Sequence, residues 1–243
     1  MRTTFFICTF ISVLISYTCQ GNGRQVYDEL PAILSKHIEA YGGEENWEQV
    51  KALQLTGQHT SFSERGDYLA IKTRDGRFYS DYNLGKHRLT EGFDGDTFWF
   101  VNPWFGSEQA RLMNDTVKNV VRQKAELFSP FYRWKEKTDQ ITFIGMEETD
   151  GLDMFVIRFS RPGMPPEDWY LDANTYLAYK YTSQWEDFTT AANSVTYFDD
   201  YRNIGGIVLP FYIEQVFSSR HTETILDEVI VNPTIDQNIF SMP

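Results

Sequence analysis

The side chains that most often perform catalysis or bind metals are few and scattered in this sequence. Its four histidines are His37, His59, His87 and His221. They show neither i, i+4 pairing nor an H-E-x-x-H motif, which are the patterns typical of zinc sites. There is no G-x-S-x-G nucleophile elbow and no glycine-rich phosphate-binding loop. We therefore expect no metal and no cofactor.

Neighbouring carboxylates could serve as the acid and base of sugar hydrolysis. The candidates are Glu147 with Glu148 and Asp199 with Asp200. Adjacent side chains on a strand point to opposite faces, so neither pair can converge on one substrate bond. A calcium site at Asp94 and Asp96 would need more oxygen ligands than that stretch supplies. We interpret these acidic residues as parts of solvent-exposed turns, and we predict that the protein is not an enzyme.

The stretch DGDTFWFVNPWFG (residues 94–106) is unusually aromatic. A strand buried on one face needs apolar residues only at alternate positions. Here both alternating sets are apolar, Phe98 with Phe100 and Trp99 with Val101. Either the protein covers both faces of this strand, or one face meets something other than the protein's own core.

Composition narrows the class of partner. The chain has 243 residues, a hydrophobic content of 42%, an aromatic content of 16% and a net charge of -12. A sizeable core can therefore form, and wholesale disorder is not expected. Nucleic-acid binding relies on clustered Lys and Arg, and the sequence shows no such cluster. We expect no nucleic-acid partner.

Residues 1–19 are typical of an export signal. One basic residue precedes an apolar run, Phe5 to Tyr17, which is short for a bilayer span. Cys19 stands where a bacterial lipoprotein carries its lipid-modified cysteine. Two interpretations stay open: Cys19 is lipidated and anchors the protein to a membrane, or the signal is ordinary and the cysteine incidental. The mass of the mature N-terminus distinguishes them.

The rest of the chain predicts two helices and many strands. Apolar residues recur at helical spacing from Gln25 to Tyr41, and Gly42-Gly43 is a stop signal. A second helical pattern starts near Asp115, which can cap it, and ends at Ser129-Pro130. Elsewhere a period of two, with Gly- and Asp-containing turns about every 10 residues, indicates an antiparallel meander.

These elements predict a mainly β protein: a single curved antiparallel sheet of about ten strands, forming an incomplete, half-open barrel with a few covering helices. One of the two alternating sets of aromatic residues would pack against the elements that support the sheet. The other set would line a hydrophobic cavity under a helical lid. The candidate cavity and lid residues are Phe98, Phe100, Trp104, Val117, Val121, Phe128, Phe131 and Trp134. The alternative is that all of them form an ordinary filled core.

Three segments also resemble a known family. They are HIEAYGGEENWEQVKALQLTG (37–57), YRNIGGIVLPFYIE (201–214) and VNPTIDQNIFSMP (231–243). Their order and spacing are similar to those of the outer-membrane lipoprotein-sorting, LolA/LolB-like group. The resemblance implies a half-barrel domain over residues 25–243, in the periplasm or on the outer membrane, which holds a lipid or an acylated protein without catalysis. The alternative function is an extracytoplasmic interaction module with a filled core and no ligand.

Overall fold

The computed structural model describes residues 23–61, 63–186, 191–217 and 220–243. The predicted signal segment 1–19 and Cys19 lie outside the described residues. All described strands lie within the predicted domain of residues 25–243. No helix in the described ranges is long and apolar enough to cross a membrane.

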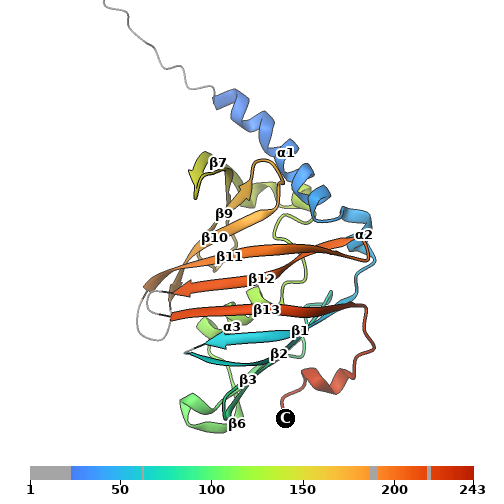
Figure 1. Ribbon diagram of the computed structural model, residues 1–243, viewed down its shortest axis with the longest axis vertical. Helices are drawn as coiled ribbons and strands as arrows, with labels where there is room; N and C mark the ends of the chain where they lie inside the picture. The colour runs from blue at the N-terminus through green and yellow to red at the C-terminus, as the bar shows by residue number, and fades with distance from the viewer. Residues whose placement is uncertain (1–22, 62, 187–190, 218–219) are drawn as a thin grey trace, which may run out of the picture.

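One antiparallel sheet of 13 strands dominates the described structure (Figure 1). Its strands are β1 (Ala52–Ser61), β2 (Glu64–Thr73), β3 (Phe78–Leu84), β4 (His87–Phe93), β5 (Phe98–Asn102), β6 (Ser107–Leu112), β7 (Ile141–Thr149), β8 (Leu152–Phe159), β9 (Glu167–Asp172), β10 (Ala178–Glu186), β11 (Ala191–Ile204), β12 (Ile207–Phe217) and β13 (Arg220–Val231). Their order in the sheet is β6-β5-β4-β3-β2-β1-β13-β12-β11-β10-β9-β8-β7.

The sheet curves without closing into a barrel, because β6 and β7 remain at its two edges. Within β1–β6 and within β7–β13, strands that follow one another in the chain pair with each other, and the pairing of β13 with β1 joins these two meanders. The predicted half-open antiparallel sheet is thus confirmed. The sequence predicts about ten strand segments. Two of them, 66–83 and 86–103, each contain a turn and form two strands, and β6 is not among them.

Three α-helices accompany the sheet in the described ranges: α1 (Gly23–Ala40), α2 (Glu44–Glu48) and α3 (Asp115–Ala125). Short 3-10 turns lie at η1 (Pro103–Phe105), η2 (Trp134–Glu136), η3 (Thr138–Gln140) and η4 (Gln237–Phe240). Helix α1 lies at the end of the sheet formed by β7 to β10 (Figure 1). It buries Leu34 completely and ends near the predicted Gly42-Gly43 stop.

Helix α3 differs from its prediction at both ends. Its cap is Asn114, whose side chain accepts a hydrogen bond from the Val117 amide, so Asp115 is the first helical residue instead of the cap. The helix ends at Ala125, and Glu126 already has an extended ψ of 123°. The chain therefore leaves the helix five residues before Pro130. We call segment 126–130 the strap.

Two hydrophobic cores lie on opposite faces of the sheet. The larger, on the inner face, includes Phe98 together with residues of α1 and α3. The smaller, on the outer face, contains Trp99 and Phe240, and the Trp99 Nε1 donates a hydrogen bond of 2.8 Å to the Phe240 carbonyl. The C-terminal segment with η4 thus covers the outer face (Figure 1). This explains why both alternating sets of the 94–106 stretch are apolar.

Candidate functional site

A cavity of about 1050 Å³ lies between the inner face of the sheet and helix α3. Apolar and aromatic side chains from both halves of the sheet form most of its wall. They include Leu53, Leu55, Tyr68, Tyr82, Leu89, Trp169, Tyr181, Phe198, Leu209, Ile213 and Leu226. Side chains on a strand alternate between the two faces, and the lining residues of β1 and β13, such as Leu53 and Leu55 or Thr224 and Leu226, are spaced by two accordingly. The curvature of the sheet therefore leaves a hollow that its own side chains do not fill.

At one end of the strands, α2 and the residue that follows α1, Tyr41, border the cavity. Trp47 is buried there, and its Nε1 donates a 2.8 Å hydrogen bond to the Tyr41 carbonyl. At the opposite end of the strands, β1, β3, β5 and β12 finish, and the last residue of each of these four lines the cavity. Those residues are Ser61, Leu84, Asn102 and Phe217. We take this end of the strands as the mouth of the cavity.

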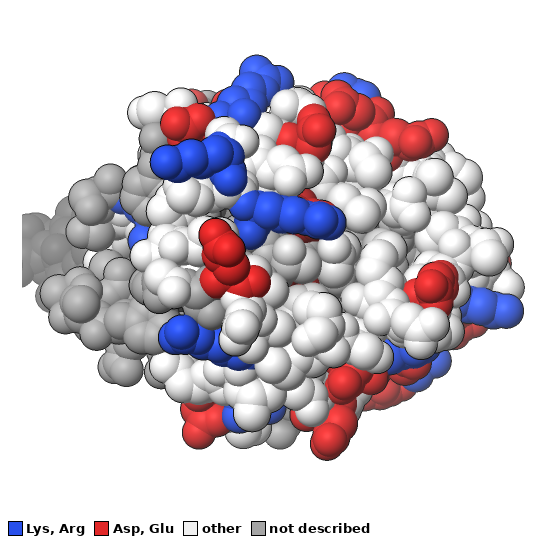
Figure 2. Space-filling view, turned by 90° about the horizontal axis from the view of Figure 1, so that it is seen from below, with Lys and Arg blue, Asp and Glu red and all other residues white. Residues whose placement is uncertain are grey.

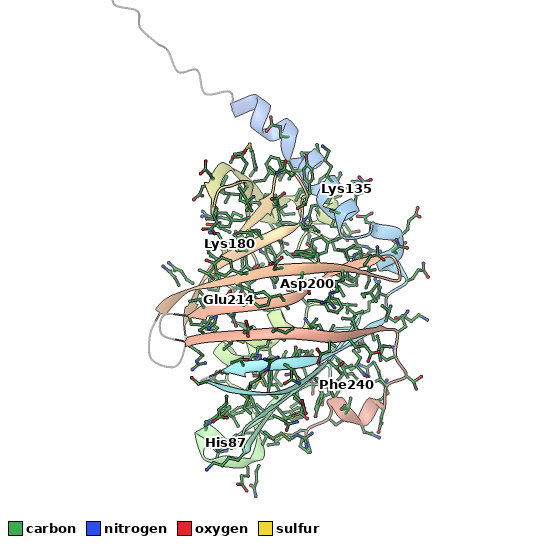
Figure 3. All side chains as sticks on the ribbon, in the orientation of Figure 1. His87, Lys135, Lys180, Asp200, Glu214 and Phe240 are labelled. Carbon is green, nitrogen blue, oxygen red and sulfur yellow. The ribbon has the colours of Figure 1, made fainter. Side chains whose placement is uncertain are left out.

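An aromatic side chain stands at the mouth. Trp104 is 42% exposed, lines the cavity and contacts the His87 ring at a centroid distance of 5.2 Å. His87 lies at the opposite end of the molecule from Lys135, which follows the α3 strap (Figure 3). The mouth is therefore partly apolar and accessible to solvent.

The structure separates the eight predicted cavity residues into two groups. Phe100, Trp104, Val117 and Phe128 line the cavity. Phe98, Val121, Phe131 and Trp134 lie outside its lining; the first three are buried and Trp134 packs against the main core. That the first group binds a ligand remains a prediction.

Side-chain polar contacts join α3 to the sheet beside the cavity. Lys124 Nζ lies 2.8 Å from the Glu91 carboxylate on β4. Gln123 donates a 2.9 Å hydrogen bond to Glu167 on β9. Glu126, just after the helix, pairs with Arg161, which also lies 3.0 Å from Glu167. The helix is thus tied to both halves of the sheet by side chains rather than by a backbone ladder.

Burial perturbs the charged groups of this cluster. Burial, partly offset by Arg161, raises the pKa of Glu126 to about 7. Burial also lowers the pKa of Lys72 to about 8, although the carboxylate of Glu126 works against it. On the cavity floor, burial and then the charge of Lys124 lower the pKa of His59 to about 4. The polar part of the cavity is therefore a partly dehydrated environment, where charges interact more strongly than in water.

Sequence reasoning missed this charged cluster. Its members come from β2, β4, α3, the β8–β9 loop and β9, and no local motif links them. One signal was available: Lys72 and Glu91 occupy positions on the otherwise apolar inner face of their strands. A charge on the buried face of a strand is unusual enough to mark a functional or structural site.

His37 is fully buried. Its Nδ1 donates to the Tyr176 carbonyl at 2.7 Å, and its Nε2 lies 2.8 Å from the Ser129 hydroxyl. Ser129 belongs to the α3 strap, so this ring joins α1, the strap and the β9–β10 turn. Burial, partly offset by the Tyr176 bond, lowers the pKa of His37 from 6.5 to about 4.

We expect this histidine to make the fold sensitive to acid. The unfolded chain takes up a proton near pH 6.5 while the folded chain resists it, so stability is lost as the pH falls from about 6.5 to about 4. The shift corresponds to about 3 kcal/mol. Urea unfolding should show the stability difference between wild type and His37→Gln shrinking by about that amount between pH 7 and pH 4. The exposed His221→Gln serves as control, and parallel curves for wild type and His37→Gln would contradict a neutral buried His37.

The charged side chains beside the cavity form ion pairs with one another. No three His, Cys, Asp or Glu side chains gather as a potential metal site in the parts of the chain that the structure describes. The ion pairs cross from the helix to the sheet. Their evident role is to hold α3 over the hollow.

Comparison with solved structures identifies the fold. A domain described as an outer membrane lipoprotein-sorting protein, from Vibrio parahaemolyticus, superposes with a TM-score of 0.57 at 11% identity, covering 86% of this chain and 94% of that one. A DUF1329 family protein from Desulfovibrio piger gives 0.55 at 10% identity, with coverages of 87% and 96%. A LolA superfamily protein from Nitrosomonas europaea gives 0.53 at 11% identity, with coverages of 87% and 96%.

These similarities are structural, because no protein-family model and no curated protein matches the sequence. At about one identical residue in ten they identify the architecture alone. They agree with the resemblance of segments 37–57, 201–214 and 231–243, which is confirmed at the level of fold. The chain has a LolA-like fold.

Proposed function

We propose that this protein is a non-enzymatic carrier that binds an acyl chain of a lipid, or of an acylated protein, in the cavity under α3. The observation that carries the proposal is the unfilled, mostly apolar hollow of about 1050 Å³ on the inner face of the sheet. Its volume is slightly above the range of about 300–1,000 Å³ that is typical of small-molecule sites. The Vibrio parahaemolyticus domain described as an outer membrane lipoprotein-sorting protein shares this architecture.

The energetics of the cavity suit a hydrocarbon chain. Each buried methylene group contributes about 0.8 kcal/mol, so ten of them supply about 8 kcal/mol before the costs of ordering. The open mouth, with Phe100, Trp104 and Phe217 on its rim, offers an apolar path from solvent to the interior. Core packing of Val121 and polar side-chain contacts hold α3, rather than a backbone ladder, so a movement of the helix would leave the strand pairing intact.

Location is part of the same proposal. We infer that the mature protein works outside the cytoplasm, in the periplasm or at the outer membrane, as the export signal at residues 1–19 suggests. Anchoring through Cys19 remains a prediction from the sequence. The cavity itself is formed by described residues between positions 41 and 226, and does not depend on the location or on Cys19.

Filling the cavity should abolish binding. Ile213 on β12 is half-buried and faces the hollow, so Ile213→Trp adds a large side chain where space exists. We expect the affinity for a fluorescent fatty acid, followed by the probe's own emission, to fall at least about tenfold, or about 1.4 kcal/mol. The melting temperature should change little, because the new ring enters a void instead of a packed core.

The matched control lies next to it in the chain. Tyr212→Trp introduces the same side chain on the opposite face of β12, since neighbouring strand residues alternate. It should bind the probe as the wild type does. If neither the wild type nor this control bound the probe saturably, the carrier proposal would be wrong; equal binding by all three proteins would place the site elsewhere.

A further inference from the structure

A second, smaller pocket of about 470 Å³ adjoins the main cavity. Segment 126–130 and Arg161 line both hollows, so they form the partition between them. The outer wall of the smaller pocket comes from the β2–β3 turn and from Lys137 and Gln140, which follow the strap. We call it the cationic pocket, because four Lys and Arg side chains line it.

The cationic pocket reverses the charge balance of the chain. Its lining contains Arg74, Arg122, Lys137 and Arg161 but one acid, Glu126. The whole chain has 22 Lys and Arg against 34 Asp and Glu. On the molecular face shown in Figure 2, by contrast, basic and acidic side chains are interspersed. An excess of cations in one small pocket of an acidic protein therefore calls for an explanation.

Three of these cations have no carboxylate partner within 4.0 Å among the described residues. Arg74 donates to the carbonyls of Trp47 and Val50. Arg122 donates to an amide oxygen on its own helix, and Lys137 Nζ to the Pro130 carbonyl at 3.1 Å. Neutral oxygens orient these groups without neutralising them, so their charge remains available to a ligand.

The fourth cation and the burial of Lys137 add to this picture. Arg161 is paired with Glu126 and Glu167, yet its Nε is buried and has no hydrogen-bond partner among the described residues. Lys137 is half-buried, and burial lowers its pKa although the charges of Glu126 and Glu136 act in the opposite direction. A bound anion would offset the effect of this burial.

The inner surface of the pocket is aromatic. Phe93, Phe128 and Phe159 line it. The Arg74 guanidinium lies 4.8 Å from the centre of the Phe128 ring, and that of Arg161 lies 4.9 Å from the Phe159 ring. Aromatic faces stabilise guanidinium groups and restrict their orientation. An aromatic surface with a cationic rim suits a ligand that has both an apolar and an anionic part.

We propose that the cationic pocket binds the phosphate monoester headgroup of an amphiphile whose acyl chain occupies the main cavity. This inference rests on the proposed carrier function. A phosphate monoester carries a charge of about −1.5 to −2 and three acceptor oxygens, which match several uncompensated donors better than a single carboxylate does. The partition formed by segment 126–130 and Arg161 would have to move, with the Glu126–Arg161 pair separating, to let the ligand span both hollows.

Two probes that differ only in the phosphate test this inference. Calorimetric titration would compare 1-oleoyl lysophosphatidic acid with 1-oleoylglycerol, both below their aggregation concentrations. We expect the wild type to bind the phosphate at least tenfold more tightly than the neutral lipid. The double variant Arg122→Gln/Lys137→Gln should lose this preference while its affinity for 1-oleoylglycerol stays unchanged. Both side chains lack a carboxylate partner, so the variant leaves no acid unpaired.

The matched control removes two charges from the same segments. Lys118→Gln/Lys135→Gln alters α3 and η2 at positions that do not line either hollow, and should keep the preference. Equal binding of both lipids, or a preference unchanged in the Arg122/Lys137 variant, would overturn the headgroup inference and leave the carrier proposal intact. Binding of neither lipid would overturn both. Equally tight binding of glycerol 3-phosphate would assign the pocket to a free phosphate ester and overturn the headgroup role.

Discussion

Replacing Lys124 with methionine is expected to lower the free energy of unfolding by about 3 kcal/mol. Lys124 Nζ contacts the Glu91 carboxylate at 2.8 Å, and the Glu91 side chain is only 11% exposed. Methionine keeps most of the length of lysine but removes the charge, so Glu91 stays buried with one weak contact, the Ser80 hydroxyl at 3.4 Å. The estimate is at the lower end for buried ion pairs, because 36% of the Lys124 side chain is exposed.

A second substitution separates charge from packing. In Lys124→Met/Glu91→Gln no carboxylate is left unpaired, so we expect urea unfolding to show most of the stability restored. Lys118→Met, on the same helix, removes an exposed pair with Asp115 and should change the stability little, because solvent screens that pair. If Glu91→Gln gave no rescue, the loss would come from another contact of Lys124, the cation–π contact of its Nζ with the Tyr82 ring at 5.5 Å. Hydrogen exchange should show α3 opening most readily in Lys124→Met.

This cluster marks the boundary of what the sequence could predict. Helix α1 and its end at Gly42-Gly43 follow from local signals, and the strands follow from alternation and turn residues, so the half-open sheet was predictable. The pairing of Lys124 with Glu91 depends on how a helix lies across a sheet, and no short-range pattern encodes that. The strap after Ala125 was likewise missed, because its extended course is fixed by contacts such as that between His37 and Ser129.

The cavity was predictable in kind but not residue by residue. Period-two alternation shows which side chains share a face of a strand, but not what covers that face. Phe100 therefore lines the hollow, whereas Phe98, on the same face, is packed against Phe93 at a ring distance of 3.8 Å. The partner of Trp99 lies 141 residues further along the chain, at Phe240. Such distant contacts require the fold itself.

Trp99 should be among the most important residues for stability, and Trp99→Ala is expected to cost about 3–5 kcal/mol. Its side chain is 2% exposed, its ring contacts Tyr79, and its Nε1 bonds to the Phe240 carbonyl. Gly92 opposite leaves room for the indole, since a Cβ atom there would lie 2.3 Å from the ring. Truncation would therefore leave a cavity and also remove the main attachment of the C-terminal segment.

The readout should separate the outer face from the inner cavity. In Trp99→Ala the C-terminal segment should become more accessible to carboxypeptidase, and urea unfolding should give the stability loss. Trp104→Ala, on the neighbouring strand connection, removes a 42% exposed indole at the cavity mouth and should lower stability much less while weakening binding of the fatty-acid probe. Equal losses of stability in the two variants would contradict the division of this aromatic stretch into a structural outer face and a ligand-facing inner face. The sheet would then depend on its rim as much as on its outer core, and the hollow could not open independently of the fold.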